Sequence, residues 1–248
     1  MAIWVIADLH LSFGTPNKEM DIFGPRWAFH TKRLEEHWKN SVAPDDLVLL
    51  PGDISWAKHL EQAMPDLEWI HQLPGTKVMI RGNHDYWWSS VKKVRAALPS
   101  SLHIIQHDSF HWEGYTIVGS RLWDTPEFSY NRLIEFVEGP QVSKLPDGNS
   151  EQDEKIFERE LHRLKLSLDQ MDPKAHTRIA MTHYPPIGPE QKPSRASELL
   201  AKYQIDVCVF GHLHNITPGT CSPFTASGVR YYLTACDYLD CTPLKIFS

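Results

Sequence analysis

Residues 77–85 read KVMIRGNHD, a short apolar run that passes directly into a glycine turn with an asparagine, a histidine and an aspartate. An apolar run closed by polar turn residues is typical of a strand that is buried on both faces. The same form recurs four times, at residues 2–7 into DLH, 46–50 into PGD, 178–181 into THYPP and 206–210 into GHLH. The sequence therefore predicts five buried strands that each end in polar side chains.

The segments between these strands have helical patterns. The clearest covers residues 151–168, where apolar residues recur every three or four positions with charges between them. Further helices are expected over 31–40, 60–70, 89–98 and 194–203. Pro65 is expected to divide the second of these into two short helices. Strands that alternate with helices favour an α/β fold.

Two antiparallel pairs and one long loop complete the organisation. Residues 103–106 are expected to form a hairpin with 115–118 around a Glu-Gly turn, and residues 229–235 a closing pair with 244–247. Residues 126–149 lack periodicity, and a loop of that length in a compact domain is often a binding loop or lid. No repeat or linker composition interrupts the chain, which predicts a single domain over 1–248.

Composition excludes several classes of protein. The chain has 248 residues, enough to bury a core without disulfides, and a formal charge of −6, which argues against a broad nucleic-acid surface. Its four cysteines form no CxxC pair, so reduced thiols are expected rather than disulfides or a zinc–thiolate cluster. No signal peptide or membrane span is evident, so we expect a cytoplasmic protein without membrane contact.

The polar residues at the strand ends are candidate metal ligands, because ligands of open α/β sheets bind beyond the carboxyl ends of the strands. Alone, each motif also fits a capped turn or a core histidine. Together, the side chains converge on one rim: Asp8, His10, Asp53, Asn83, His183, His212 and His214. Oxygen and imidazole donors without thiolate suit Mn, Fe, Co or Zn. Seven donors are too many for one ion, which points to two divalent ions that share a bridging carboxylate.

The order D-x-H, G-D, G-N-H-D, strand-end His and G-H-x-H, from Asp8 to His214, resembles the calcineurin-like metallophosphoesterase superfamily. The phrases at residues 6–14, 81–88 and 236–239 are similar to a bacterial group of predicted phosphohydrolases of unassigned substrate. The resemblance implies a four-layer αββα sandwich, with two mixed sheets flanked by helices and the metal site at the carboxyl ends of the strands. It also implies a phosphohydrolase that acts through a hydroxide bridging two ions.

The resemblance further implies individual roles. The first ion would be held by Asp8, His10, Asp53 and His214, and the second by Asp53, Asn83, His183 and His212. His84 would face the substrate phosphate and protonate the leaving oxygen, and Asp85 would orient the imidazole of His84. A small phosphorylated substrate is the expected partner.

Three further residues are candidates for substrate contact. Arg81 and Arg121 could clamp a phosphate bidentately, although Arg81 fits a surface position equally well. Trp56 could stack on a base or sugar, although packing is the simpler role for a tryptophan. Two other classes of function stay open, a nuclease acting on DNA or RNA and a non-catalytic interaction scaffold. The oligomeric state is not encoded in these patterns.

Overall fold

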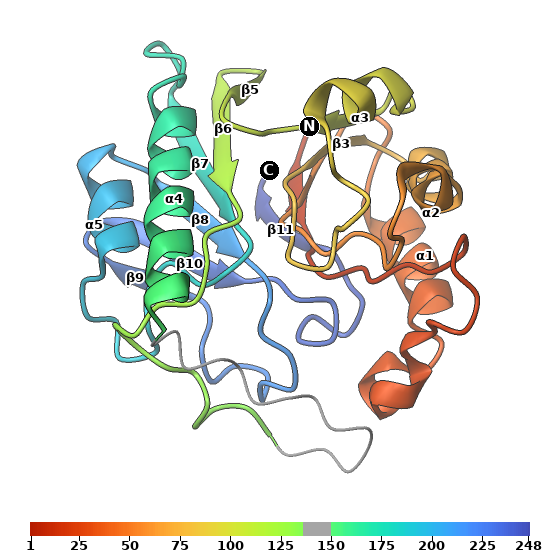
Figure 1. The fold of residues 1–248 in the computed structure, drawn as a ribbon. Helices are drawn as coiled ribbons and strands as arrows, with labels where there is room; N and C mark the ends of the chain where they lie inside the picture. Colours follow the sequence, from red (N-terminus) through yellow and green to blue (C-terminus); the bar gives the residue numbers. More distant parts are fainter. Residues whose placement is uncertain (136–149) are drawn as a thin grey trace.

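The computed structural model describes residues 1–135 and 150–248 and contains two mixed β-sheets that lie face to face (Figure 1). The first sheet has the order β11 (Leu244–Phe247), β1 (Ile3–Val5), β2 (Leu47–Leu50), β3 (Thr76–Met79), β4 (Leu102–Ile104). The second has the order β5 (Ser109–Trp112), β6 (Tyr115–Ser120), β7 (Thr177–Thr182), β8 (Val207–Phe210), β10 (Val229–Leu233), β9 (Phe224–Ala226). The antiparallel strands β11, β5 and β9 lie at sheet edges, and the other strands pair in parallel.

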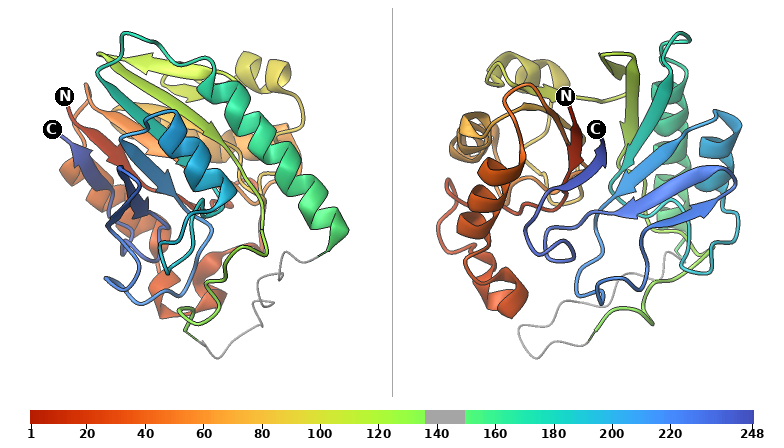
Figure 2. Two further views of the ribbon diagram at one scale, coloured as in Figure 1. Left: turned by 90° about the vertical axis from the view of Figure 1, so that its left-hand side faces the viewer. Right: turned by 180° about the vertical axis from the view of Figure 1, so that it is seen from behind.

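Helices cover the outer face of each sheet (Figure 2). The first sheet carries α1 (His30–Ser41), α2 (Leu60–Gln72) and α3 (Val91–Ala97), and the second carries α4 (Glu151–Leu168) and α5 (Arg195–Lys202). Two short 3₁₀ turns, Met20–Phe23 and Pro25–Trp27, precede α1. The helices α4 and α5 begin where Ser150 and Ser194 accept hydrogen bonds from the third backbone N–H of the helix. Such caps satisfy N–H groups that lack a partner within the helix.

Alternation along the strands produces three apolar layers. In β2, Leu47 and Leu49 pack between the two sheets, whereas Val48 and Leu50 pack outward against the helices of the first sheet. Because successive side chains of a strand point to opposite faces, a strand buried on both sides is apolar throughout. The same division in the second sheet separates the layer between the sheets from the layer under α4 and α5. The predicted αββα sandwich is confirmed.

The helix over residues 60–72 corrects one expectation. Pro65 lies inside a continuous α2 instead of dividing it. Inside a helix, proline removes one backbone hydrogen bond and its ring crowds the carbonyl four residues earlier. Asp66, the next residue, is buried and accepts bonds from the backbone of Phe13 and the hydroxyl of Ser55, so tertiary contacts hold this turn of the helix in place.

Both predicted antiparallel pairs are wrong in their partners. The Glu113-Gly114 turn is present, but it joins β6 to β5, while β4 pairs with β3 in the other sheet. Likewise, β10 pairs with β8 and β9 in the second sheet, and β11 pairs with β1 in the first. The chain crosses between the sheets after β4 and again after β10, and local patterns of hydrophobicity carry no signal of such a crossing.

Three other expectations concern the chain as a whole. All four cysteines are free and buried. Within the described residues, no helix is long and apolar enough to cross a membrane. The loop predicted over 126–149 falls mostly on residues 136–149, which lie outside the described residues.

We expect the layer between the sheets to contribute strongly to stability. Leu49→Ala removes a fully buried side chain from that layer and should lower the free energy of unfolding by about 2–5 kcal/mol. Leu166→Ala, on the exposed side of α4, is the matched control and should change it by less than about 0.5 kcal/mol. Urea unfolding of both variants measures the difference, and equal losses would contradict this assignment of the core.

Candidate metal centre

The seven candidate ligands lie on loops that follow strands of both sheets. Asp8 and His10 follow β1, Asp53 follows β2, Asn83 follows β3, His183 follows β7, and His212 and His214 follow β8. Hydrogen bonds join the loops of the two sheets, as from the Ala7 N–H to the carbonyl of Thr234 at 2.8 Å and from the His212 N–H to Oδ2 of Asp8 at 3.0 Å. Residues more than 200 positions apart therefore meet at one rim.

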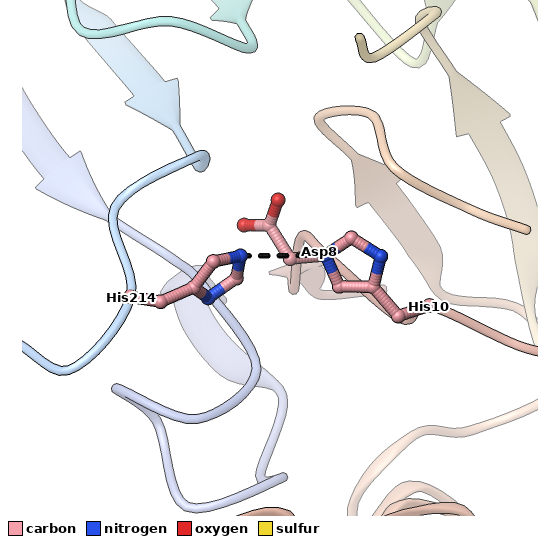
Figure 3. Close-up of side chains that lie close together, drawn as sticks. All are labelled: Asp8, His10 and His214. Carbon is pink, nitrogen blue, oxygen red and sulfur yellow. Dashed lines mark hydrogen bonds between the residues drawn. The ribbon is translucent and has the colours of Figure 1, made fainter. Parts of the chain in front are cut away.

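One group of ligand atoms belongs to Asp8, His10 and His214 (Figure 3). One potential donor atom from each of these side chains lies within 4.8 Å of the others. The Nε2 atoms of His10 and His214 are 3.3 Å apart, and His10 Nε2 lies 3.7 Å from Oδ2 of Asp53. Asp8, His10, His214 and Asp53 are the four residues expected to hold the first ion.

A second group surrounds His183. Its Nε2 atom lies 2.6 Å from Oδ1 of Asn83 and 3.4 Å from Oδ2 of Asp53. The same Asn83 oxygen lies 3.1 Å from Nδ1 of His212. Oδ2 of Asp53 thus faces both groups, which is the position that a bridging carboxylate requires.

The donor set fits divalent ions. Metal bonds of about 2.0–2.2 Å place neighbouring ligand atoms roughly 3–3.5 Å apart, close to the separations in both groups. Burial holds the pKa of His10 and of His212 well below the usual range, so both imidazoles are neutral and able to ligate. Burial also raises the pKa of Asp8 to about 7. A buried carboxylate of this kind is stabilised in its ionised form by a cation.

Hydrogen bonds select the ring nitrogen that each of two histidines presents. Nδ1 of His183 donates to the carbonyl of Pro51 at 3.0 Å, which leaves Nε2 as the ligand atom. Nδ1 of His214 donates to Oδ1 of Asp237 at 2.8 Å, and Oδ2 of Asp237 accepts the backbone N–H of Asn215. Burial works to lower the pKa of His214, but Asp237 outweighs it and raises that pKa to about 9.

Sequence reasoning did not find Asp237. It is buried 23 positions beyond the histidine that it orients, and no spacing rule links an aspartate to a histidine at that separation. The one available signal was the CDYL phrase at residues 236–239, which contributed to the resemblance without a role.

The ligand loops depart from ordinary backbone geometry. Four of the candidate ligands have positive φ: Asp8 (58°), His10 (45°), Asp53 (52°) and His212 (71°). Each such non-glycine residue costs about 1–2 kcal/mol, and strain of this kind concentrates at functional sites. Glycine is required between the loops as well, because a Cβ on Gly82 would collide with the carboxylate and the backbone nitrogen of Asp53.

His84 lies beside the first group of ligands. Its backbone N–H donates to Oδ1 of Asp53 at 2.8 Å, and its ring is 5.6 Å from the His10 ring. Trp56 contacts both histidines, with ring centroids 4.5 Å from His84 and 4.8 Å from His10, onto which it stacks. Trp27, which sequence reasoning did not single out, packs edge-on against His10. Burial lowers the pKa of His84.

Asp85 is bound to the loops around it. Its carboxylate accepts the backbone N–H groups of Ile54, Ser55 and Gly82 and the indole N–H of Trp87, at 2.7–3.1 Å. Among the described residues, none of the hydrogen bonds that Asp85 accepts comes from the His84 imidazole. Asp85 therefore fixes the turn that carries His84 and, contrary to what the sequence led us to expect, does not bond directly to the imidazole.

Arg81 and Arg121 meet at a single pocket of about 180 Å³. Nε of Arg81 donates to the carbonyl of Asp85 at 3.2 Å, so the side chain lies along the turn that carries Asn83 and His84. Arg121 donates to Glu160 at 3.2 Å and lies over the ring of Trp123. The structure thus brings the two candidate arginines together.

Asp237→Asn keeps the shape of the side chain but removes the charge that orients His214. We expect the affinity for Mn²⁺ to fall by about 10–100-fold, as is usual when the hydrogen-bond partner of a ligating histidine is changed. Competition with a chromophoric chelator measures this. Asp240→Asn, at an exposed carboxylate, is the control and should stay within about twofold of wild type.

Gly82→Ala should abolish tight Mn²⁺ binding, since the added methyl group must displace the Asp53 carboxylate. Gly82 does not have positive φ, so its substitution introduces the collision without left-handed backbone strain. Gly219→Ala is the opposite control, because Gly219 has positive φ but its added methyl would meet no atom within 4 Å. Metal content after gel filtration is the measurement. Full metal retention in Gly82→Ala would show that the close approach of the two loops is unimportant.

Several known proteins resemble this chain in sequence or in fold. An 83-residue stretch is 35% identical to the gene 66 protein of Mycobacterium phage D29, and it covers 34% of this chain and 40% of the phage protein, less than half of its length. The fold is similar to that of a phosphopantetheinyl hydrolase from Mycobacterium tuberculosis, with a TM-score of 0.56 and 16% identity over 94% of this chain and 88% of the other. A calcineurin-like phosphoesterase from Bacillus subtilis aligns with a TM-score of 0.47 and 15% identity over 96% and 82% of the two chains.

The sequence profile of the calcineurin-like phosphoesterases matches residues 1–215. That range contains every strand-end motif from Asp8 to His214 and therefore both groups of candidate ligands. The chain belongs to the calcineurin-like phosphoesterase family, whose members are hydrolases that act on phosphoric ester bonds.

Proposed function

We propose that this protein is a hydrolase of small phosphate esters, whether monoesters, diesters or nucleotides, that depends on two divalent ions. The observation that carries the proposal is the position of Asp53, whose Oδ2 atom faces His10 in one ligand group and His183 in the other. Nitrogen and oxygen donors without thiolate favour Mn, Fe, Zn or Co. Asp8, His10 and His214 would complete the first site, and Asn83, His183 and His212 the second.

When bound, such a pair of ions neutralises phosphate oxygens and lowers the pKa of water. The protein orients the side chains that would hold the ions. Pro51 and Asp237 fix the tautomers of two ligating histidines, and Asn83 adds an oxygen without adding charge. Because the two carboxylates of Asp8 and Asp53 neutralise only half the charge of two divalent ions, an acidic protein can present a cationic site to a phosphorylated substrate.

His84 is the proposed proton donor to the leaving oxygen. It flanks the first ligand group without being one of its members, and histidine exchanges protons near neutral pH more readily than a carboxylate or a lysine does. Trp56 supports the His84 ring from one side, which favours a positioning role for this tryptophan over stacking on a substrate. Asp85 holds the turn beneath it.

The purified protein supplied with Mn²⁺ should hydrolyse p-nitrophenyl phosphate, bis-p-nitrophenyl phosphate or nucleotides. Exclusive cleavage of DNA or RNA would favour the nuclease alternative instead, which the formal charge of −6 disfavours. No hydrolysis of any of these compounds by the metal-loaded protein would favour the scaffold alternative.

His84→Ala should lower kcat by about 10²–10⁴-fold while metal content stays at the wild-type value, because the imidazole protonates the leaving group and is not a ligand. His111→Ala, at an exposed position on β5, should leave both quantities unchanged. Turnover and metal content are measured on the same samples. An unchanged kcat in His84→Ala would exclude the proton-donor role.

A further inference from the structure

A pocket of about 180 Å³ lies between the ends of β4 and β6 and is lined by three arginines, Arg81, Arg121 and Arg163. A water molecule takes up about 30 Å³ of liquid, so the pocket has room for a group as large as a phosphate or a carboxylate. Arg81 follows β3 of the first sheet, Arg121 follows β6 of the second sheet, and Arg163 lies on α4. Neither the metal centre nor the proposed proton transfer uses Arg163.

The pocket adjoins the metal centre. In the first sheet β4 is the parallel neighbour of β3, and in the second sheet β6 is the parallel neighbour of β7. The pocket is therefore on the same rim as the ligands, one strand further along each sheet. Arg81 precedes Asn83 by two residues, and the carbonyl of Arg121 accepts the backbone N–H of His183 at 3.2 Å.

The pocket has a surplus of positive charge. Among the described residues that line it, Glu160 is the one carboxylate, and its side chain is only 3% exposed. Oε1 of Glu160 accepts bonds from Arg163 at 2.7 Å and Arg121 at 3.2 Å, so one carboxylate faces several guanidinium groups. Burial, and next the charge of Arg121, lowers the pKa of Arg81, but a guanidinium stays protonated at any ordinary pH.

Clustered guanidinium groups repel one another, and an oxyanion that accepts paired N–H bonds from them relieves that repulsion. We propose that this pocket is a second oxyanion subsite, which binds a phosphate or carboxylate that the substrate carries in addition to its scissile phosphate. The inference rests on the proposed function and narrows the substrate class to phosphate esters with two anionic groups.

Inhibition of p-nitrophenyl phosphate hydrolysis by the Mn²⁺-loaded protein tests the subsite, with Mn²⁺ kept in excess. Methylphosphonate offers one anionic group, and alkanediyl bisphosphonates with one to four methylene groups offer two at increasing separation. At least one bisphosphonate should inhibit wild type about tenfold more strongly than methylphosphonate, as expected for an added charge-assisted contact. The matching phosphonocarboxylates distinguish a phosphate subsite from a carboxylate subsite.

Arg163→Gln should reduce this preference to within about twofold, while kcat and KM for p-nitrophenyl phosphate stay near wild type, because that substrate carries a single phosphate. Arg159→Gln is the matched control. Arg159 bonds the same Glu160 oxygen at 3.3 Å but is not among the described residues that line the pocket, so the variant should keep the preference.

The proposal is overturned if no bisphosphonate is preferred by wild type, or if Arg163→Gln keeps the preference. Failure of wild type to hydrolyse p-nitrophenyl phosphate counts against the proposed function alone. Calorimetric titration of the same compounds into the Mn²⁺-loaded wild type and the two variants then decides the subsite. Bisphosphonate binding that Arg163→Gln weakens supports it, and binding that Arg163→Gln leaves unchanged refutes it.

Discussion

Two carboxylates, Asp8 and Asp53, are fully enclosed where the two sheets meet, and this burial is the constraint on which the rest of the rim depends. A buried charge is costly unless it is paired or bound to a cation. The surroundings shift the pKa of the two carboxylates in opposite directions. Burial works to raise the pKa of Asp53, but His183 and His10 outweigh it and hold that pKa well below the usual range. At Asp8 burial prevails, so this side chain gains most from an added cation.

The strained geometry of the ligand loops is a second consequence of the same placement. Each loop must turn sharply as it leaves its strand to aim a side chain at a common point, and several residues adopt positive φ to do so. Three apolar layers of buried side chains fix the ends of the strands from which the loops start. The rigid scaffold therefore maintains backbone conformations that an isolated loop would relax.

Sequence predicted the parts of this protein that depend on local pattern. Five buried strands and α4 were evident because full burial and helical amphipathicity each leave a periodic signature. The pairing of β4 and β10 was wrong because both are followed by crossings between sheets, which have no signature. Asp237 was missed for a related reason, since its contact with His214 exists only in the folded chain. The candidate ligands could be named from the sequence because each one follows the end of a strand, and parallel strands in one sheet end on one side.

The candidate ligands are divided between the sheets, four on loops of the first and three on loops of the second. Metal ions that contact side chains from both sheets at once would favour the packed arrangement of the sheets over a separated one, to an extent that grows with the ion concentration. Because such linkage is reciprocal, loosening the apolar layer between the sheets must also weaken ion binding, even from a position remote from every ligand. For ions held by candidate ligands from both sheets, cohesion of the two sheets and affinity for the ions would therefore be thermodynamically coupled.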